Sequence, residues 1–111
     1  MELRDIAAKI REAVERIETV GAEYAKAKGI AYQFGKMREV VLAMEMKKHL
    51  GTNANKSMEA LCSPKYISHL EATAIAVEEE QKLKASYVRW NSQYEAYRSF
   101  LSLEKAKMKL V

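Results

Sequence analysis

The sequence is poor in residues that interrupt helices. It contains one proline and four glycines among its 111 residues, and it has hardly any clusters of the β-branched residues that favour strands. Its most frequent residues are Ala, Glu, Lys and Leu, which are strong helix formers, as are its Met and Arg residues. The composition argues against a sheet and predicts an all-α protein, with residues 1–111 forming a single helical domain.

Cysteine and long apolar runs are also scarce. The single cysteine, Cys62, excludes an internal disulfide. No stretch approaches the roughly 18–20 uncharged apolar residues that a membrane-spanning helix needs, and the N-terminus lacks the apolar core of a secretory signal. We therefore expect a cytoplasmic protein with no membrane contact.

Motifs that carry catalytic or metal chemistry are missing. His49, Cys62 and His69 flank the predicted turn, but their spacing fits no zinc pattern and a fourth ligand is lacking. The sequence has no glycine-rich phosphate loop, and it fixes no histidine or acid beside Cys62. We expect no cofactor, no metal, no catalytic residues and no enzymatic activity.

Two stretches carry apolar residues at coiled-coil spacing, in alternating steps of three and four. The first runs through residues 3–34, and the second resumes through residues 83–101 after an earlier run at 67–77. If the chain folds back near residue 57, the two places where the spacing slips face each other, which predicts a locally overwound hairpin. The slips fall at 31–37 in the first stretch, which resumes at Val41 and Met44 after Phe34 and Met37, and at 77–83 in the second, after the run Ile67, Leu70, Ala74 and Val77.

This pattern predicts a long antiparallel helical hairpin with helices over about 2–49, 57–62 and 64–109. Gly51 suits a cap after the first helix, and Asn55 or Ser57 suits the N-cap of the short helix. Ser63 and Pro64 form a favourable start for the last helix. The first helix is expected to be weak or bent at three glycines, which are Gly21, Gly29 and Gly35.

A second apolar face remains after the hairpin is formed. Exposing it would leave a larger apolar patch than monomers usually show. We expect two hairpins to form a homodimer that is a four-helix bundle. The alternative is a break in the first helix, which would give a compact monomer. The residues of this face are Val14, Ala22, Ile30, Tyr32, Val40 and Leu42 in the first helix, and Ile75, Val88, Phe100 and Leu103 in the last.

The net charge of +4 is unevenly distributed. Basic residues at 36–48 are expected beside the acidic segment 71–80, so that ion pairs cross between the helices. An excess of positive charge is left at one level of the hairpin, and it could contact an anionic partner. This group, the basic band, consists of Lys26, Lys28, Lys82, Lys84 and Arg89. Ordinary solvated side chains explain it equally well.

The last helix contains a run of aromatic residues that could stack on nucleic-acid bases or on a partner protein. Their coiled-coil spacing favours packing inside the hairpin, with Tyr24 opposite Trp90, and tyrosine hydroxyls suit a partly wet interface. The candidate interface residues are Tyr87, Trp90, Tyr94 and Tyr97.

The second half of the chain resembles small helical proteins of bacterial phages and prophages. The resemblance lies in Tyr66-Ile67-Ser68-His69-Leu70-Glu71, in Tyr94-Glu95-Ala96-Tyr97-Arg98-Ser99 and in Glu104-Lys105-Ala106-Lys107-Met108. Such proteins are often encoded beside recombination or replication genes. The resemblance implies an accessory protein that binds a DNA recombination or replication protein. Binding of single-stranded nucleic acid and inhibition of a host protein are the alternatives.

A less favoured alternative is an enzyme similar to the all-helical chorismate mutase. Leu3-Arg4, Arg11 and Lys28 look similar to the first-helix pattern of that family, whose basic side chains hold a dianionic substrate. The chain lacks the loop that separates the first two helices of that family and a clear Glu/Gln pair later on.

Overall fold

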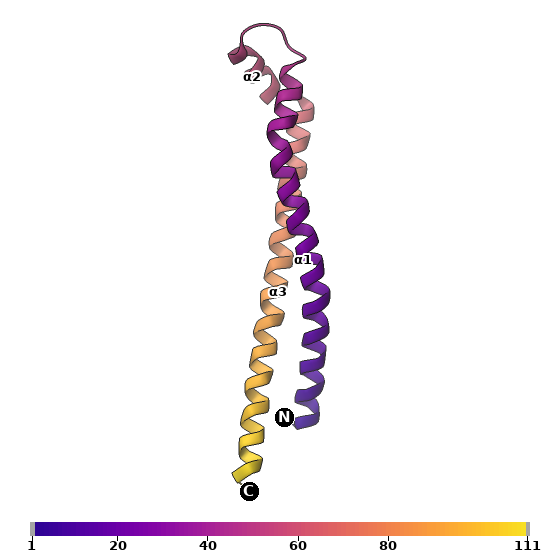
Figure 1. Cartoon of the computed structure of the whole chain (residues 1–111), viewed down its shortest axis with the longest axis vertical. Coiled ribbons are helices and arrows are strands. Elements are labelled where there is room, and N and C mark those ends of the chain that lie inside the picture. Colours follow the sequence, from indigo (N-terminus) through magenta and orange to yellow (C-terminus); the bar gives the residue numbers. More distant parts are fainter. Residues whose placement is uncertain (1, 111) are drawn as a thin grey trace. The chain divides into compact units, whose positions relative to one another are not determined.

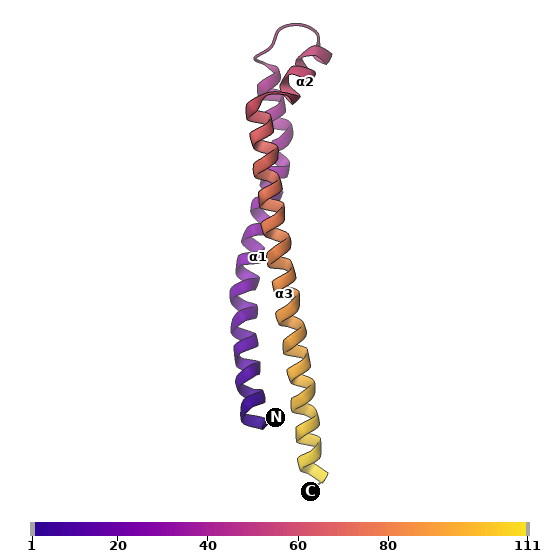
Figure 2. The same ribbon diagram turned by 180° about the vertical axis from the view of Figure 1, so that it is seen from behind.

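The computed structural model describes residues 2–110, which form three helices and no strand. The helices are α1 (Leu3–Met46), α2 (Asn53–Leu61) and α3 (Pro64–Leu110). Helix α1 packs against α3 as an antiparallel hairpin, and α2 lies in the connection between them (Figure 1, Figure 2). This confirms the all-α helical hairpin.

The chain forms two compact units, which we describe separately. Unit 1 contains the chain up to Ala25 together with the chain from Lys82 onwards, and unit 2 contains Lys26–Gln81 with all of α2. Helices α1 and α3 each contribute to both units. Within residues 2–110, no helix is both long and apolar enough to cross a membrane.

Helix α1 ends at Met46, three residues before the predicted end. The amides of Lys48 and His49 donate to the carbonyls of Glu45 and Met46, three residues back, so the chain tightens and leaves the helix. Gly51, with φ of +116°, lies further along in the loop and is not the helix cap we predicted. The three glycines inside α1 do not interrupt it.

The ends of the other helices depend on hydroxyl caps. Helix α2 begins at Asn53, four residues before the predicted start, because the Thr52 hydroxyl already accepts the amide of Asn55 at 3.2 Å. The predicted caps of this helix were therefore wrong. Helix α3 begins as expected at Pro64, and Ser63 caps it by accepting the amide of Tyr66 at 3.1 Å.

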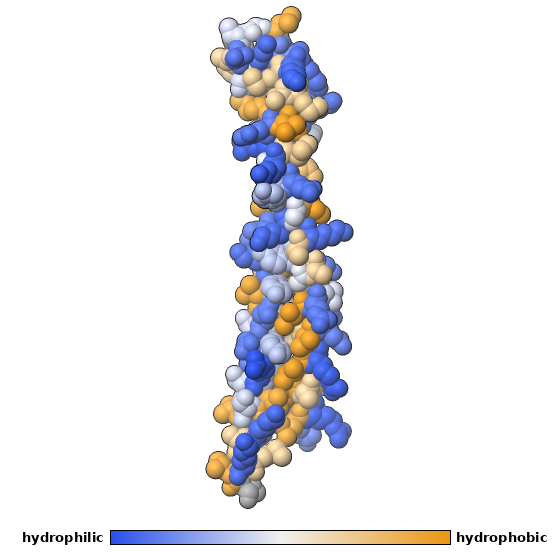
Figure 3. Space-filling model, viewed as in Figure 1, coloured by the Kyte–Doolittle hydropathy of each residue, from blue (hydrophilic) through white to orange (hydrophobic). Residues whose placement is uncertain are grey.

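In unit 1, the face that joins α1 to α3 follows the apolar pattern of the sequence. Its positions, which we call the seam, recur every three or four residues over 3–24 and 83–104. Ile6 and Ala13 are fully buried there, and apolar side chains gather on the surface of this part of the molecule (Figure 3). The ring of Tyr24 packs on Tyr87 at 5.9 Å, one helical turn away from the predicted pairing with Trp90.

In unit 2, the seam keeps the same spacing but changes chemistry. Arg38 and Glu45 occupy the seam positions that we predicted for Met37 and Met44. The predicted slip in the packing is therefore wrong, because the apolar residues leave the seam while the helices stay in phase. The seam of α3 is likewise shifted by one residue, since Tyr66, His69, Thr73 and Ala76 lie inward while Ile67, Leu70, Ala74 and Val77 are exposed.

Ion pairing differs from the prediction as well. Arg38 hydrogen-bonds Tyr66, and Lys48 pairs with Glu45 of its own helix at 3.0 Å, so neither reaches the acidic segment 71–80. The register explains this, because Arg38 lies level with the first turn of α3. Three further ion pairs also join residues three apart in one helix, Lys9–Glu12, Arg98–Glu95 and Lys107–Glu104.

Candidate binding surface

Helix α1 presents a second row of apolar side chains in unit 2, which runs beside the seam. Because heptad spacing returns a residue to the same side of a helix, members of this row share one face. We call this row the outer stripe, and it consists of Ile30, Met37, Val40 and Met44. Their side chains are 42%, 47%, 47% and 60% exposed.

Two shallow hollows lie along the outer stripe. The first, of about 220 Å³, lies between Ile30 and Met37 and is also lined by Gln33, Phe34 and His69. The second, of about 380 Å³, lies beside Met44, where Val41, Glu45, Lys48, Lys65, Ser68 and His69 line it. Since α3 contributes to both hollows, the stripe belongs to a surface formed by two helices.

His69 fixes the two helices to each other beneath this surface. Its Nε2–H donates to the Phe34 carbonyl at 2.9 Å, and its ring lies 5.7 Å from the Phe34 ring. The Thr73 hydroxyl donates to the His69 carbonyl at 2.8 Å. These contacts form the floor of the first hollow, and neither Met37 nor Met44 takes part in them.

Helix α3 extends the same surface with an apolar residue. Ile75 lies seven residues after Ser68, so both residues face the same side of α3. Ile75 is 68% exposed. The outer stripe and Ile75 therefore present five large apolar side chains in unit 2.

Lysines lie at both ends of the outer stripe. Lys26 precedes Ile30 by one turn, and Lys47 follows Met44 by three residues. Lys48 lies beside the second hollow, and its hydrogen bond to Glu45 raises the pKa of its ammonium group. The surface is thus apolar along its length and cationic at its ends.

The basic band that we predicted is divided between the units. Lys26 and Lys28 lie in unit 2, whereas Lys82, Lys84 and Arg89 lie in unit 1. All five side chains are exposed. Their role in binding stays a prediction.

The aromatic residues are part of the seam of unit 1. Tyr87, Trp90, Tyr94 and Tyr97 are half-buried between α1 and α3. The guanidinium groups of Arg16 and Arg89 lie 5.8 Å and 5.9 Å from the Trp90 ring, and that of Arg98 lies 5.7 Å from the Tyr94 ring. These contacts favour the packing interpretation, because arginines already occupy ring surface that a base would stack on.

Of the residues that suggested enzymatic or metal chemistry, His69 lines both hollows of the outer stripe. Arg4 and Arg11 are exposed on α1 in unit 1, and Lys28 is exposed in unit 2. Cys62 is a free, exposed thiol. Over residues 2–110, no three His, Cys, Asp or Glu side chains lie close enough to hold a metal ion.

Sequence reasoning did not recognise the outer stripe as one surface. It assigned Met37 and Met44 to the seam, and Ile30 and Val40 to a separate face. The signal was present, because the apparent slip after Phe34 occurs where a second apolar row runs beside the first. Compared with protein-family models, curated proteins and solved structures, the chain matches none of them.

Proposed function

We propose that the chain is a non-catalytic binding protein that holds an amphipathic helix of another protein on the outer stripe. The observation that carries this proposal is the heptad spacing of four exposed apolar side chains on a helix whose other face is already packed. A heptad row of this kind suits the apolar face of a partner helix. Methionines make such a surface adaptable, because their unbranched side chains fill irregular gaps.

The charge around the stripe indicates the chemistry of the partner. Lys26, Lys47 and Lys48 flank it at both ends, so a partner helix with acidic residues beside its apolar row would be complementary. Two copies of this chain would fit less well. An antiparallel pair of outer stripes centred on Met37 would place Lys26 of one copy near Lys47 of the other, and a parallel pair would place Lys47 beside Lys47.

The resemblance to phage and prophage proteins indicates where such a partner acts. On that resemblance, we propose that the partner belongs to DNA recombination or replication. A photo-crosslinking residue at Val40, introduced during expression in the bacterial host, would identify the partner. A partner from another process would contradict this assignment while leaving helix binding intact.

A designed peptide tests helix binding directly. The probe is a labelled 21-residue amphipathic helix with leucine at its a and d positions and glutamate at its e and g positions. We expect it to bind with at least tenfold higher affinity than the same peptide with lysine at e and g. Met37→Glu with Met44→Glu should abolish binding, whereas Met58→Glu should have no effect, because Met58 is 68% exposed on α2 and lies outside the stripe. Equal affinity for the glutamate and lysine peptides would contradict the proposal. Equal binding by the wild type and by the variant with Met37→Glu and Met44→Glu would contradict it as well.

Binding of single-stranded nucleic acid is the second candidate, because the basic band is exposed in both units. A labelled oligonucleotide at low salt tests it. If phosphate contacts dominate, affinity falls steeply with added salt and Lys84→Glu with Arg89→Glu weakens it. The variant Met37→Glu should not change this binding. A complete lack of binding by the wild-type protein would leave the protein partner as the sole candidate.

The homodimer stays a prediction that sedimentation at micromolar concentration can check. A dimer would have twice the chain mass of 12.7 kDa. If a dimer forms, the charge argument above predicts that Met37→Glu leaves it intact. Phe100 and Leu103, which are 51% and 58% exposed in unit 1, are then the apolar residues to test.

A further inference from the structure

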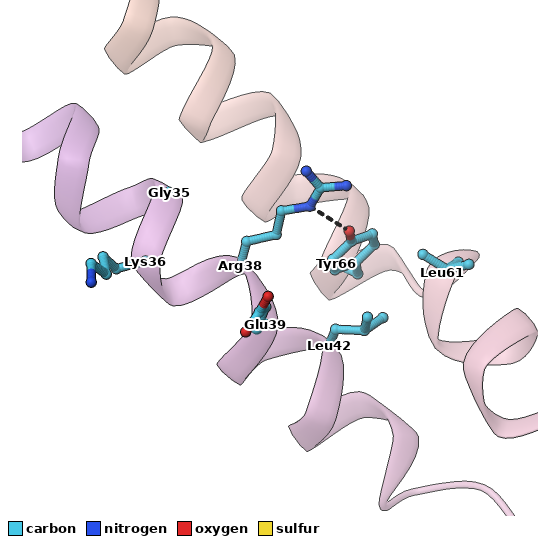
Figure 4. Close-up of a pocket in the computed structure, with 7 residues that line it drawn as sticks. All are labelled: Gly35, Lys36, Arg38, Glu39, Leu42, Leu61 and Tyr66. Atoms are coloured by element: carbon cyan, nitrogen blue, oxygen red, sulfur yellow. Dashed lines mark hydrogen bonds between the residues drawn. The ribbon is translucent and has the colours of Figure 1, made fainter. Parts of the chain in front are cut away.

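We propose that unit 2 contains a binding pocket for a carboxylate that carries an apolar group. The pocket lies where α1, α2 and the first turn of α3 meet (Figure 4). Its volume is about 580 Å³, within the range of small-molecule and peptide-terminus sites. It is lined by Gly35, Lys36, Arg38, Glu39, Leu42, Leu61 and Tyr66.

Arg38 is a charged, exposed residue at a seam position that an apolar residue would normally occupy. Its Nε–H donates to the Tyr66 hydroxyl oxygen at 3.1 Å. Tyr66 is only 2% exposed, and Ser63 holds its backbone amide at the start of α3. The tyrosine is therefore a fixed anchor that sets the direction of the guanidinium group.

This arrangement leaves hydrogen-bond donors available. Within residues 2–110, the terminal nitrogens of Arg38 have no hydrogen bond or ion pair, and the Tyr66 hydroxyl proton has no acceptor. A guanidinium binds a carboxylate through two parallel N–H···O bonds. A phenol O–H beside it can add a third donor.

The walls of the pocket indicate what else the ligand carries. Leu42 of α1 and Leu61 of α2 point toward each other on one side of Tyr66 (Figure 4). Gly35 contributes no side chain, and a Cβ atom there would meet nothing within 4 Å. The pocket therefore combines a cationic end with an apolar side, which suits a carboxylate next to an aliphatic group.

Two kinds of ligand carry a carboxylate next to an aliphatic group. One is the C-terminal residue of a polypeptide, and the other is a free aliphatic acid. The pocket is separate from the outer stripe, because none of the residues that line it belongs to the stripe or its hollows. The inference does not depend on the proposed function. Met37→Glu should leave carboxylate binding unchanged, so the two proposals can fail independently.

Fluorescence anisotropy with a labelled hexapeptide ending in Ala-Leu tests the pocket. We expect the free acid to bind at least tenfold more tightly than the C-terminal amide. Arg38→Gln should weaken binding of the free acid at least tenfold, and Arg38→Lys should restore only part of it because lysine lacks the planar fork. Glu39→Gln should strengthen binding, since it removes a negative charge from the pocket lining.

Gly35→Met provides a second variant in case Arg38→Gln does not fold, which circular dichroism would reveal. It fills the pocket from a helical position with open space around it, so it should abolish binding and keep the fold. Competition by N-acetylleucine as strong as by unlabelled peptide would assign a free acid, and much weaker competition would assign a polypeptide terminus. Equal affinities for acid and amide, unchanged binding by folded Arg38→Gln or Gly35→Met, or no binding at millimolar concentrations would each overturn the proposal.

Discussion

Both units pack α1 against α3, and they differ in what fills the seam. In unit 1, apolar and aromatic residues occupy nearly every seam position, as the sequence pattern predicted. In unit 2, Arg38, His69 and Glu45 take seam positions, and apolar neighbours such as Met37 lie outside. Apolar periodicity therefore locates the apolar surfaces of a helix but does not determine which of them packs within the chain.

The largest expected effect separates two adjacent residues of unit 2. Tyr66→Ala should lower the free energy of unfolding by about 3–5 kcal/mol, because it empties a buried ring position. Ile67→Ala should cost about 1 kcal/mol or less, because Ile67 is 43% exposed. Urea denaturation of both variants measures the contrast. If Ile67→Ala lowered the free energy of unfolding more than Tyr66→Ala does, the seam predicted from the apolar pattern would be correct.

A smaller effect is expected for the aromatic seam of unit 1. Trp90 is half-buried and contacts two arginines. Trp90→Ala should therefore cost about 2–3 kcal/mol, less than a fully buried ring would. The same denaturation experiment checks it, with Val88→Ala, 55% exposed, as the control. Unchanged stability with lost partner binding would instead identify the aromatic run as a recognition surface.

The smallest effects compare glycines of α1 in the two units. Gly29→Ala in unit 2 should stabilise the protein by about 0.5–1 kcal/mol, because the new methyl group meets nothing within 4 Å. Gly21→Ala in unit 1 places a Cβ atom 3.1 Å from the Tyr87 ring, so much of that gain should be lost. Thermal melting of both variants compares them, and an equal rise would show that Tyr87 moves freely.

The sequence was sufficient for the helices and for the seam of unit 1, because both depend on local and periodic signals. Ser63 and Pro64 placed the start of α3 correctly. The start of α2 was missed because Thr52, Asn55 and Ser57 are all suitable caps, and only the backbone geometry selects Thr52. The seam of unit 2 was missed because the hydrogen bond of Arg38 to Tyr66 and that of His69 to Phe34 join residues far apart in sequence.

Disulfide crosslinking in unit 2 tests the central claim, that polar side chains replace apolar ones at several seam positions there and that the outer stripe lies outside the seam. In a Cys62→Ser background, one variant carries Phe34→Cys with His69→Cys, and the other carries Met37→Cys with Val77→Cys. Phe34 and His69 are in contact across the seam. Met37 and Val77 are both exposed, and they would lie side by side only in the predicted register, in which the chain folds back near residue 57. We predict rapid oxidation of the 34/69 pair and little of the 37/77 pair. Rapid oxidation of the 37/77 pair, with little of the 34/69 pair, would contradict the account.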